Sequence, residues 1–219
     1  MKKLLFVLLV LVAGPVLAQD WGYPRLGNVV DVASNDVLNV RAQPTASAPI
    51  IGALAHNARG VEIIERVADG AWGRVNINGQ SGFVSMRYVD DRDWYDSWAG
   101  LGQPLYCHGT EPFWSAVVAD FNTGLALQFD SMNYGTFKMD FGAVGGAWGY
   151  PDWGQPWMNV YTFENAMTQS EGAVVMRAEL CSDGMSDQVY GIRAHFEISR
   201  MQSNGQMYLT YDGCCSLQR

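Results

Sequence analysis

The residues best suited to chemistry in this chain of 219 residues are its four cysteines. Two of them stand apart, Cys107 next to His108 and Cys181 at the start of the turn-rich run Cys-Ser-Asp-Gly-Met-Ser-Asp, and the other two, Cys214 and Cys215, are adjacent. Such cysteines could be thiolate nucleophiles, metal ligands or partners in disulfides. The choice depends on the compartment in which the protein folds.

Residues 1–18 have the layout of a secretory signal peptide. A basic start precedes an apolar run from Leu4 to Val12, and Val16 and Ala18 occupy the cleavage positions. The run is short for a membrane span, so we expect cleavage and no membrane span in the mature chain. The mature protein is therefore predicted to be periplasmic or secreted.

An oxidising compartment favours disulfides over free thiols. A bridge between the adjacent Cys214 and Cys215 would be strained, so we expect Cys107 and Cys181 each to pair with one of them, in either combination. Neighbours in a strand point to opposite faces, so one bridge should lie inside the domain and the other outside. Cys107 is thus predicted to be bridged rather than nucleophilic.

The rest of the sequence gives little sign of catalysis. The histidines, His56, His108 and His195, lie in different segments, and the sequence contains no H-E-x-x-H, G-x-S-x-G, Walker or zinc-spaced cysteine pattern. We expect a non-catalytic protein without a cofactor or a metal site.

Carboxylates occur near the Cys181 run. Asp183 and Asp187 flank a turn, where a pair of acids could bind calcium or act as acid and base, but capping of the turn is the commoner role. Glu111 could contact Ser186 or the backbone of that turn and lock a strand onto it.

The charge of the chain limits its partners. The net charge is −8 at pH 7, and cleavage would remove Lys2 and Lys3 without any acid, which leaves −10. Nucleic acids and anionic lipid surfaces require a clustered basic surface, so neither is an expected partner.

Aromatic residues mark one further candidate site. In residues 145–157, Trp148, Trp153 and Trp157 alternate with glycine and proline, which predicts a loop. Flat aromatic faces in a loop suit stacking on sugar rings or on a peptide. The alternative is a loop that covers the mouth of a barrel with its indoles buried.

We expect a short, mobile lead-in at residues 19–26, and residues 27–90 contain short strand-like runs separated by turn residues. Asn78-Gly79 between two runs predicts a tight hairpin. This pattern predicts a small barrel with an inward-facing core, made of Leu38, Val40, Leu54, Val61, Ile63, Val75 and Val84.

The order and spacing of several motifs in this segment resemble a bacterial SH3-like (SH3b) domain, namely Leu38-Asn39-Val40-Arg41, Pro44, Gly52, Leu54, Trp72-Gly73-Arg74-Val75, Gly79, Gly82-Phe83-Val84 and Tyr88-Val89. The resemblance implies an adhesive module for cell-wall peptide or glycan. The candidate ligand-binding residues are Asn39, Arg41, Trp72 and Tyr88. Asn39 and Arg41 could instead satisfy loop carbonyls, and Trp72 could cap the core.

Residues 91–104 form an acidic, aromatic linker. It is either solvated or docks the two domains together through Trp94, Tyr95 and Trp98.

Residues 105–219 are predicted to form a second all-β domain. Strand candidates between residues 113 and 215 alternate without a convincing helix, which predicts a disulfide-tied antiparallel barrel of about eight strands. The segments Gly109 to Trp114, Cys181 to Asp187 with Tyr190, and Gly213-Cys214-Cys215 resemble a family of bacterial envelope barrels, similar to HslJ-type and lysozyme-inhibitor barrels. That resemblance implies no established activity, and Gln188 replaces a basic residue typical of the family.

The leading hypothesis is an all-β envelope protein that binds peptidoglycan or an envelope protein through the SH3-like domain. The alternative is an inhibitor of a lytic enzyme such as lysozyme, in which the barrel presents an acidic surface to a basic partner. A third reading is a structural role in an envelope assembly. The sequence does not indicate the oligomeric state.

Overall fold

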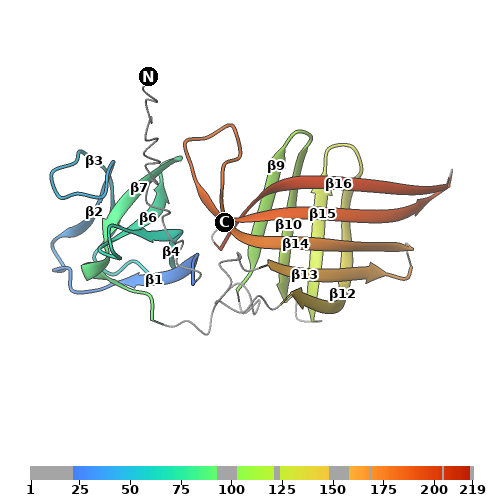
Figure 1. Cartoon of the computed structure of the whole chain (residues 1–219), viewed down its shortest axis with the longest axis horizontal. Coiled ribbons are helices and arrows are strands. Elements are labelled where there is room, and N and C mark those ends of the chain that lie inside the picture. The colour runs from blue at the N-terminus through green and yellow to red at the C-terminus, as the bar shows by residue number, and fades with distance from the viewer. Residues whose placement is uncertain are drawn as a thin grey trace, which may run out of the picture.

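The structure is a computed structural model that describes residues 22–92, 103–120, 124–147, 158–167, 169–203 and 205–217. The predicted signal peptide and two groups of predicted contact residues lie outside the described residues, namely Trp94, Tyr95 and Trp98 and the loop residues Trp148, Trp153 and Trp157. The chain forms two β modules, each with its own core (Figure 1). Within the ranges given, no helix has the length and apolarity needed to span a bilayer.

The N-terminal module is built from two small sheets, with strand orders β3-β2-β7-β6-β5 and β4-β1-β8. Its elements are β1 (Arg25–Val29), β2 (Val37–Arg41), β3 (Ile50–Ala55), β4 (Val61–Ile63), β5 (Glu65–Val67), β6 (Trp72–Ile77), β7 (Gln80–Ser85), a single 3-10 turn η1 (Met86–Tyr88) and β8 (Val89–Asp90).

The core of this module follows the predicted alternation. The buried set includes Leu38, Val40, Val61, Ile63, Val75 and Val84, whereas Leu54 is only partly buried. The predicted hairpin at Asn78-Gly79 joins β6 to β7, with φ of 50° and 77°. Both residues tolerate this left-handed conformation, so the local sequence fixes the turn.

The module begins earlier and ends later than the sequence predicts. Tyr23, placed in the lead-in, and Asp91, placed in the linker, are each 4% exposed. The Tyr23 hydroxyl donates a hydrogen bond to the Asp91 carboxylate, which Arg66 also binds at 2.6 Å. Burial and the Asp91 carboxylate raise the pKa of the Tyr23 phenol well above its usual value. The sequence hides this boundary because β1 is held by β4 and β8, which are distant along the chain.

The C-terminal module is a closed antiparallel barrel, as predicted. Its strands are β9 (Leu105–Thr110), β10 (Phe113–Asp120), β11 (Leu125–Ser131), β12 (Gly135–Ala147), β13 (Met158–Asn165), β14 (Ser170–Cys181), β15 (Tyr190–Gln202) and β16 (Gly205–Ser216). Consecutive strands are neighbours, and β16 pairs with β9 to close the barrel. The sequence did not reveal β9, because its inward positions are Leu105, Cys107 and Gly109, of which only Leu105 is a large aliphatic residue.

Aromatic side chains fill the interior of the barrel. The ring of Trp114 lies 5.4 Å from that of Phe129 and 5.0 Å from that of Phe196, and Tyr211 lies 4.8 Å from Phe129. Tyr161 and Phe163 are also fully buried there. These contacts combine large apolar burial with favourable ring geometry. The interior is therefore a packed core.

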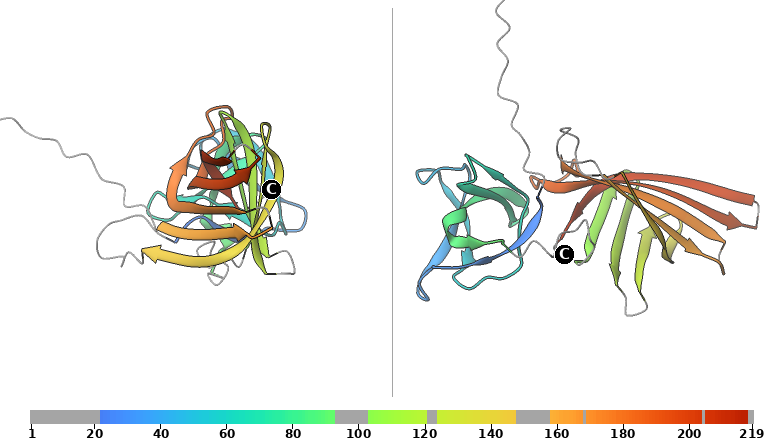
Figure 2. Two further views of the ribbon diagram at one scale, coloured as in Figure 1. Left: turned by 90° about the vertical axis from the view of Figure 1, so that its right-hand side faces the viewer. Right: turned by 60° about the horizontal axis from the view of Figure 1, so that its bottom comes forward.

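Part of the range 145–157, which the sequence predicts to be a loop, forms strand instead. Gly145 to Ala147 continue β12 and pair with Val160, Asn159 and Met158 of β13. Glycine is rare in strand interiors, which is why the local sequence favoured a loop. The long strands β14, β15 and β16 extend beyond their neighbours on the side away from the N-terminal module (Figures 1 and 2).

Two disulfides join the four cysteines, Cys107–Cys215 and Cys181–Cys214. Cys107 and Cys215 face each other across the seam between β9 and β16 and belong to the barrel core. Cys181 and Cys214 form a separate cluster with Tyr190. The predicted arrangement of one inner and one outer bridge is confirmed, and the structure decides the pairing.

Paired serine substitutions at Cys107 and Cys215 should lower the free energy of unfolding by about 3–5 kcal/mol. The reason is that this bridge restricts an unfolded loop spanning 108 residues. The Cys181–Cys214 bridge spans 33 residues, so its removal should cost about 1 kcal/mol less on the same entropic basis. Urea denaturation of the two double variants measures both losses. A larger loss for the shorter loop would contradict this ranking.

Candidate functional site

A groove on the N-terminal module brings together all four of its predicted ligand-binding residues. Asn39, Arg41, Trp72 and Tyr88 line one cavity of about 560 Å³, which we call the β2–β6 groove. Its rim includes residues of the loop before β2, among them Asp31 and Asp36, and Arg87 from η1.

Strand alternation places these side chains. In β2, Leu38 and Val40 are buried in the core, so Asn39 and Arg41 face away from it. Trp72 begins β6 opposite Ser85 of β7, and Tyr88 ends η1. Segments far apart in sequence thus converge on one surface.

The groove combines both charge signs with aromatic rings. The Arg41 guanidinium donates to the carbonyl of Ala48 at 2.7 Å, so this side chain also holds a loop, as the alternative reading expected. The guanidinium carbon of Arg87 lies 5.5 Å from the centre of the Tyr88 ring. These charged and aromatic side chains are suited to hydrogen bonding with a ligand and to stacking on it. No group of His, Cys, Asp or Glu among the described residues is placed to hold a metal ion.

The second predicted feature, the turn between β14 and β15, is organised by Asp183. Its carboxylate accepts hydrogen bonds from the N–H groups of Met185 at 3.0 Å and Ser186 at 2.9 Å, and from the Ser186 hydroxyl at 2.8 Å. The Thr110 hydroxyl donates to the Asp183 carbonyl at 3.1 Å. Glu111, a sequence candidate for contacting Ser186 or the backbone of this turn, is exposed. The geometry is that of a capped turn locked onto β9.

This turn has an unusual electrostatic environment. Burial acts to raise the pKa of Asp183, but hydrogen bonds from Ser186 and Met185 outweigh it and lower the pKa to about 2. His108 Nε2 lies 3.8 Å from the carboxylate, and its ring packs edge-on against Tyr190 with 4.8 Å between centres. Burial, reinforced by the charge of Asp183, raises the pKa of the Tyr190 hydroxyl.

The same turn docks onto the N-terminal module. The N–H of Ser81 donates to the carbonyl of Asp187 at 2.9 Å, and Gln80 forms an isolated parallel bridge with Asp187. The Asn76 side chain donates to the carbonyl of Val189 at 2.9 Å and accepts from its N–H at 3.3 Å. The turn that looked like a local feature therefore joins the two modules.

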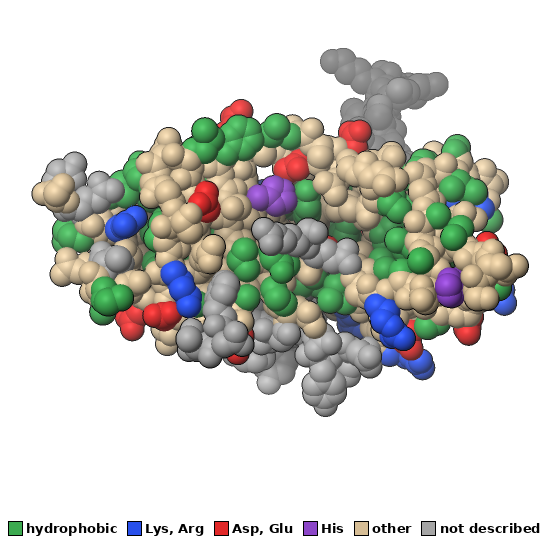
Figure 3. Space-filling model, turned by 180° about the vertical axis from the view of Figure 1, so that it is seen from behind, with side chains coloured by type: hydrophobic (Ala, Val, Ile, Leu, Met, Phe, Trp, Pro, Cys, Tyr) green, Lys and Arg blue, Asp and Glu red, His purple; other side chains and the backbone are tan. Residues whose placement is uncertain are grey.

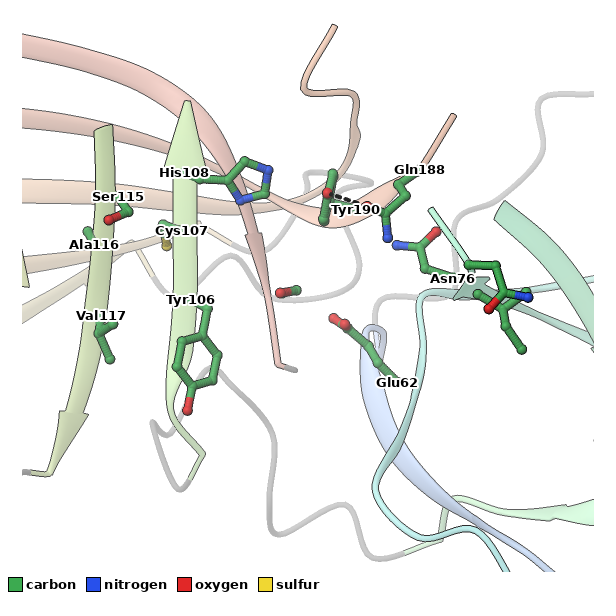
Figure 4. A pocket seen from close by; sticks show the side chains of 13 residues that line it. Glu62, Asn76, Tyr106, Cys107, His108, Ser115, Ala116, Val117, Gln188 and Tyr190 are labelled. Atoms are coloured by element: carbon green, nitrogen blue, oxygen red, sulfur yellow. Dashed lines mark hydrogen bonds between the residues drawn. The ribbon is translucent and has the colours of Figure 1, made fainter. Parts of the chain in front are cut away.

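A second cavity, of about 500 Å³, lies between the modules (Figure 4). Glu62 and Asn76 line it from the N-terminal side, and Tyr106, His108 and Tyr190 line it from the barrel. Sequence reasoning missed it, because its residues come from separate stretches and no local motif connects them.

Comparison with known families identifies one of the modules. Residues 36–90 match the family model of the bacterial SH3 domain. The N-terminal module is a bacterial SH3 domain. Its groove residues Asn39, Arg41, Trp72 and Tyr88 all fall inside the matched segment. A search of curated proteins finds no match to the chain.

The substitution Asp183→Asn should reduce the acid sensitivity of the fold. Folding lowers the pKa of Asp183 from 3.8 to about 2. The ionised carboxylate therefore stabilises the folded state at pH values above the pKa that Asp183 has in the unfolded chain. That stabilisation is lost as the pH falls through the pKa that Asp183 has in the folded state. Thermal denaturation from about pH 5 to pH 2 should therefore show a smaller loss of stability in the variant. The matched control is Asp187→Asn, whose side chain is exposed and whose docking contacts use its backbone. If acidification lowered the thermal stability of the wild type and of Asp183→Asn equally, this role of Asp183 would be contradicted.

Removal of the Asn76 side chain should loosen the junction. Asn76→Ala abolishes both hydrogen bonds to Val189, so exchange of the Val189 N–H should accelerate about tenfold, equivalent to about 1.4 kcal/mol. Native-state hydrogen exchange measures the effect. Asn39→Ala, in the β2–β6 groove, should leave this amide unchanged; an unchanged rate in both variants would show that the contact does not hold the modules together.

Proposed function

We propose that the protein is a non-catalytic protein of the bacterial envelope that binds cell-wall peptide or glycan in the β2–β6 groove. The observation that carries this proposal is the convergence of Asn39, Arg41, Trp72 and Tyr88 in one groove of a bacterial SH3 domain. Aromatic faces stack on sugar rings and peptide planes, while the amide and guanidinium groups can bond hydroxyl and carbonyl oxygens.

An exported location is part of the proposal. The two disulfides support it, because such bonds persist in the periplasm and outside the cell. The predicted signal peptide points the same way. On the face shown in Figure 3, Lys and Arg side chains are scattered among Asp and Glu rather than gathered into a basic patch. Such a surface suits a polar ligand better than a polyanion.

The direct test is sedimentation of the mature protein with purified peptidoglycan over a range of protein concentrations. Trp72→Ala should weaken binding about tenfold, or about 1.4 kcal/mol, because a stacking face is lost. The matched control is Tyr208→Ala, which removes an aromatic side chain that is 73% exposed on the barrel. No retention of the wild type at moderate salt, or an equal loss in both variants, would refute the groove as the binding site.

A second candidate function is inhibition of a lytic enzyme such as lysozyme by the barrel. It is favoured by a groove of about 590 Å³ on the barrel, lined by Glu164, Glu171, Glu197 and the exposed Tyr208. A surface of this kind is complementary to a basic partner. Unchanged lysis rates in the presence of excess mature protein would dispose of this function.

A further inference from the structure

The cavity between the modules differs from the β2–β6 groove in its chemistry. Among its described lining residues, Glu62 is the acid, and neither lysine nor arginine is present. The opposite wall carries the aromatic side chains of Tyr106, His108 and Tyr190. Its volume of about 500 Å³ lies within the usual range for small-molecule sites.

Glu62 reaches the cavity because its neighbours in β4 belong to the core. Val61 and Ile63 pack inside the SH3 domain, and the Glu62 side chain points towards the barrel (Figure 4). It is 7% exposed, and its Oε1 accepts a hydrogen bond from the N–H of Leu217 at 3.0 Å. Negative charge shielded from water acts strongly on neighbouring groups. The wall of the cavity therefore favours a cation.

The barrel side of the cavity reinforces this preference. Burial is the main cause of the raised pKa of Tyr190, and the negative charges of Asp183 and Glu62 add to it. Tyr106 projects from β9 next to Cys107 of the barrel core, and His108 projects from the same strand (Figure 4). The faces of the tyrosine rings attract cations, and more so when water is excluded.

We propose that this cavity binds a small molecule with a primary ammonium group, carried by an amino sugar or by a peptide amine. The Glu62 carboxylate would accept charge-assisted hydrogen bonds from the ammonium group. Tyr106 and Tyr190 would face the cation and its carbon chain, and the carboxamide of Gln188 would bond the neutral polar part. The site is separate from the β2–β6 groove and does not depend on it.

Calorimetric titration of the mature protein tests the proposal with two matched pairs of probes. One pair is glucosamine and N-acetylglucosamine, and the other is a short lysine peptide and the same peptide acetylated at its amines. At least one free amine should bind, and its acetylated counterpart should bind at least tenfold more weakly. The pair that shows this difference identifies the source of the ammonium group.

Three variants locate the binding. Glu62→Gln keeps the shape of the side chain and an acceptor for the Leu217 N–H but removes the charge, so affinity should fall at least tenfold. Glu171→Gln removes the same charge from the outer wall of the barrel and should have no effect. Ser115→Tyr places a bulky side chain at an exposed position on the cavity wall and should abolish binding without changing Glu62.

Several outcomes would overturn the proposal: no binding of either amine, equal affinity for amines and acetylated probes, an equal loss in Glu171→Gln, or undiminished binding in Ser115→Tyr. Trp72→Ala should leave amine binding unchanged, because Trp72 lies in the other groove. Failure of this site and failure of the peptidoglycan-binding groove are therefore distinguishable.

Discussion

The adjacent cysteines near the end of β16 are the constraint on which the rest of the structure depends. Alternation sends Cys215 into the barrel, where it joins Cys107 across the closing seam, and sends Cys214 outward to Cys181. The seam has a short ladder of paired residues, Tyr106 to His108 against Cys214 to Ser216. The inner bridge therefore closes the barrel, and the outer bridge anchors the turn that docks on the SH3 domain.

The turn between β14 and β15 joins the two modules through its contacts with the SH3 domain. Asp183 shapes the turn from within, and Asp187 and Val189 present backbone groups to Ser81 and Asn76. Leu217 adds a backbone contact to Glu62 from the end of β16. These contacts help to hold together the two walls of the inter-module cavity. The β2–β6 groove, by contrast, belongs to the SH3 domain alone.

The sequence predicted what local patterns control. The hairpin at Asn78-Gly79 and the alternating core around Val40 and Val75 could be read from short stretches, whereas the candidate groove residues followed from the resemblance to an SH3b domain. What it missed depends on partners far along the chain. Pairing with β4 and β8 orders the start of the SH3 domain, and the barrel recruits the weakly patterned β9. The role of Glu62 likewise depends on the opposing module.

The ring-filled interior of the barrel has a consequence for how freely its sequence can vary. At inward positions such as Val174, Met176 and Phe196, the volume of the side chain limits which substitutions are tolerated. A larger side chain would clash with the neighbouring rings, and a smaller one would create a void. Outward positions such as Val175 and Arg177 contribute little to that packing. Substitutions should therefore accumulate at every second residue along the barrel strands, so that new surfaces can arise on the barrel while its fold is conserved.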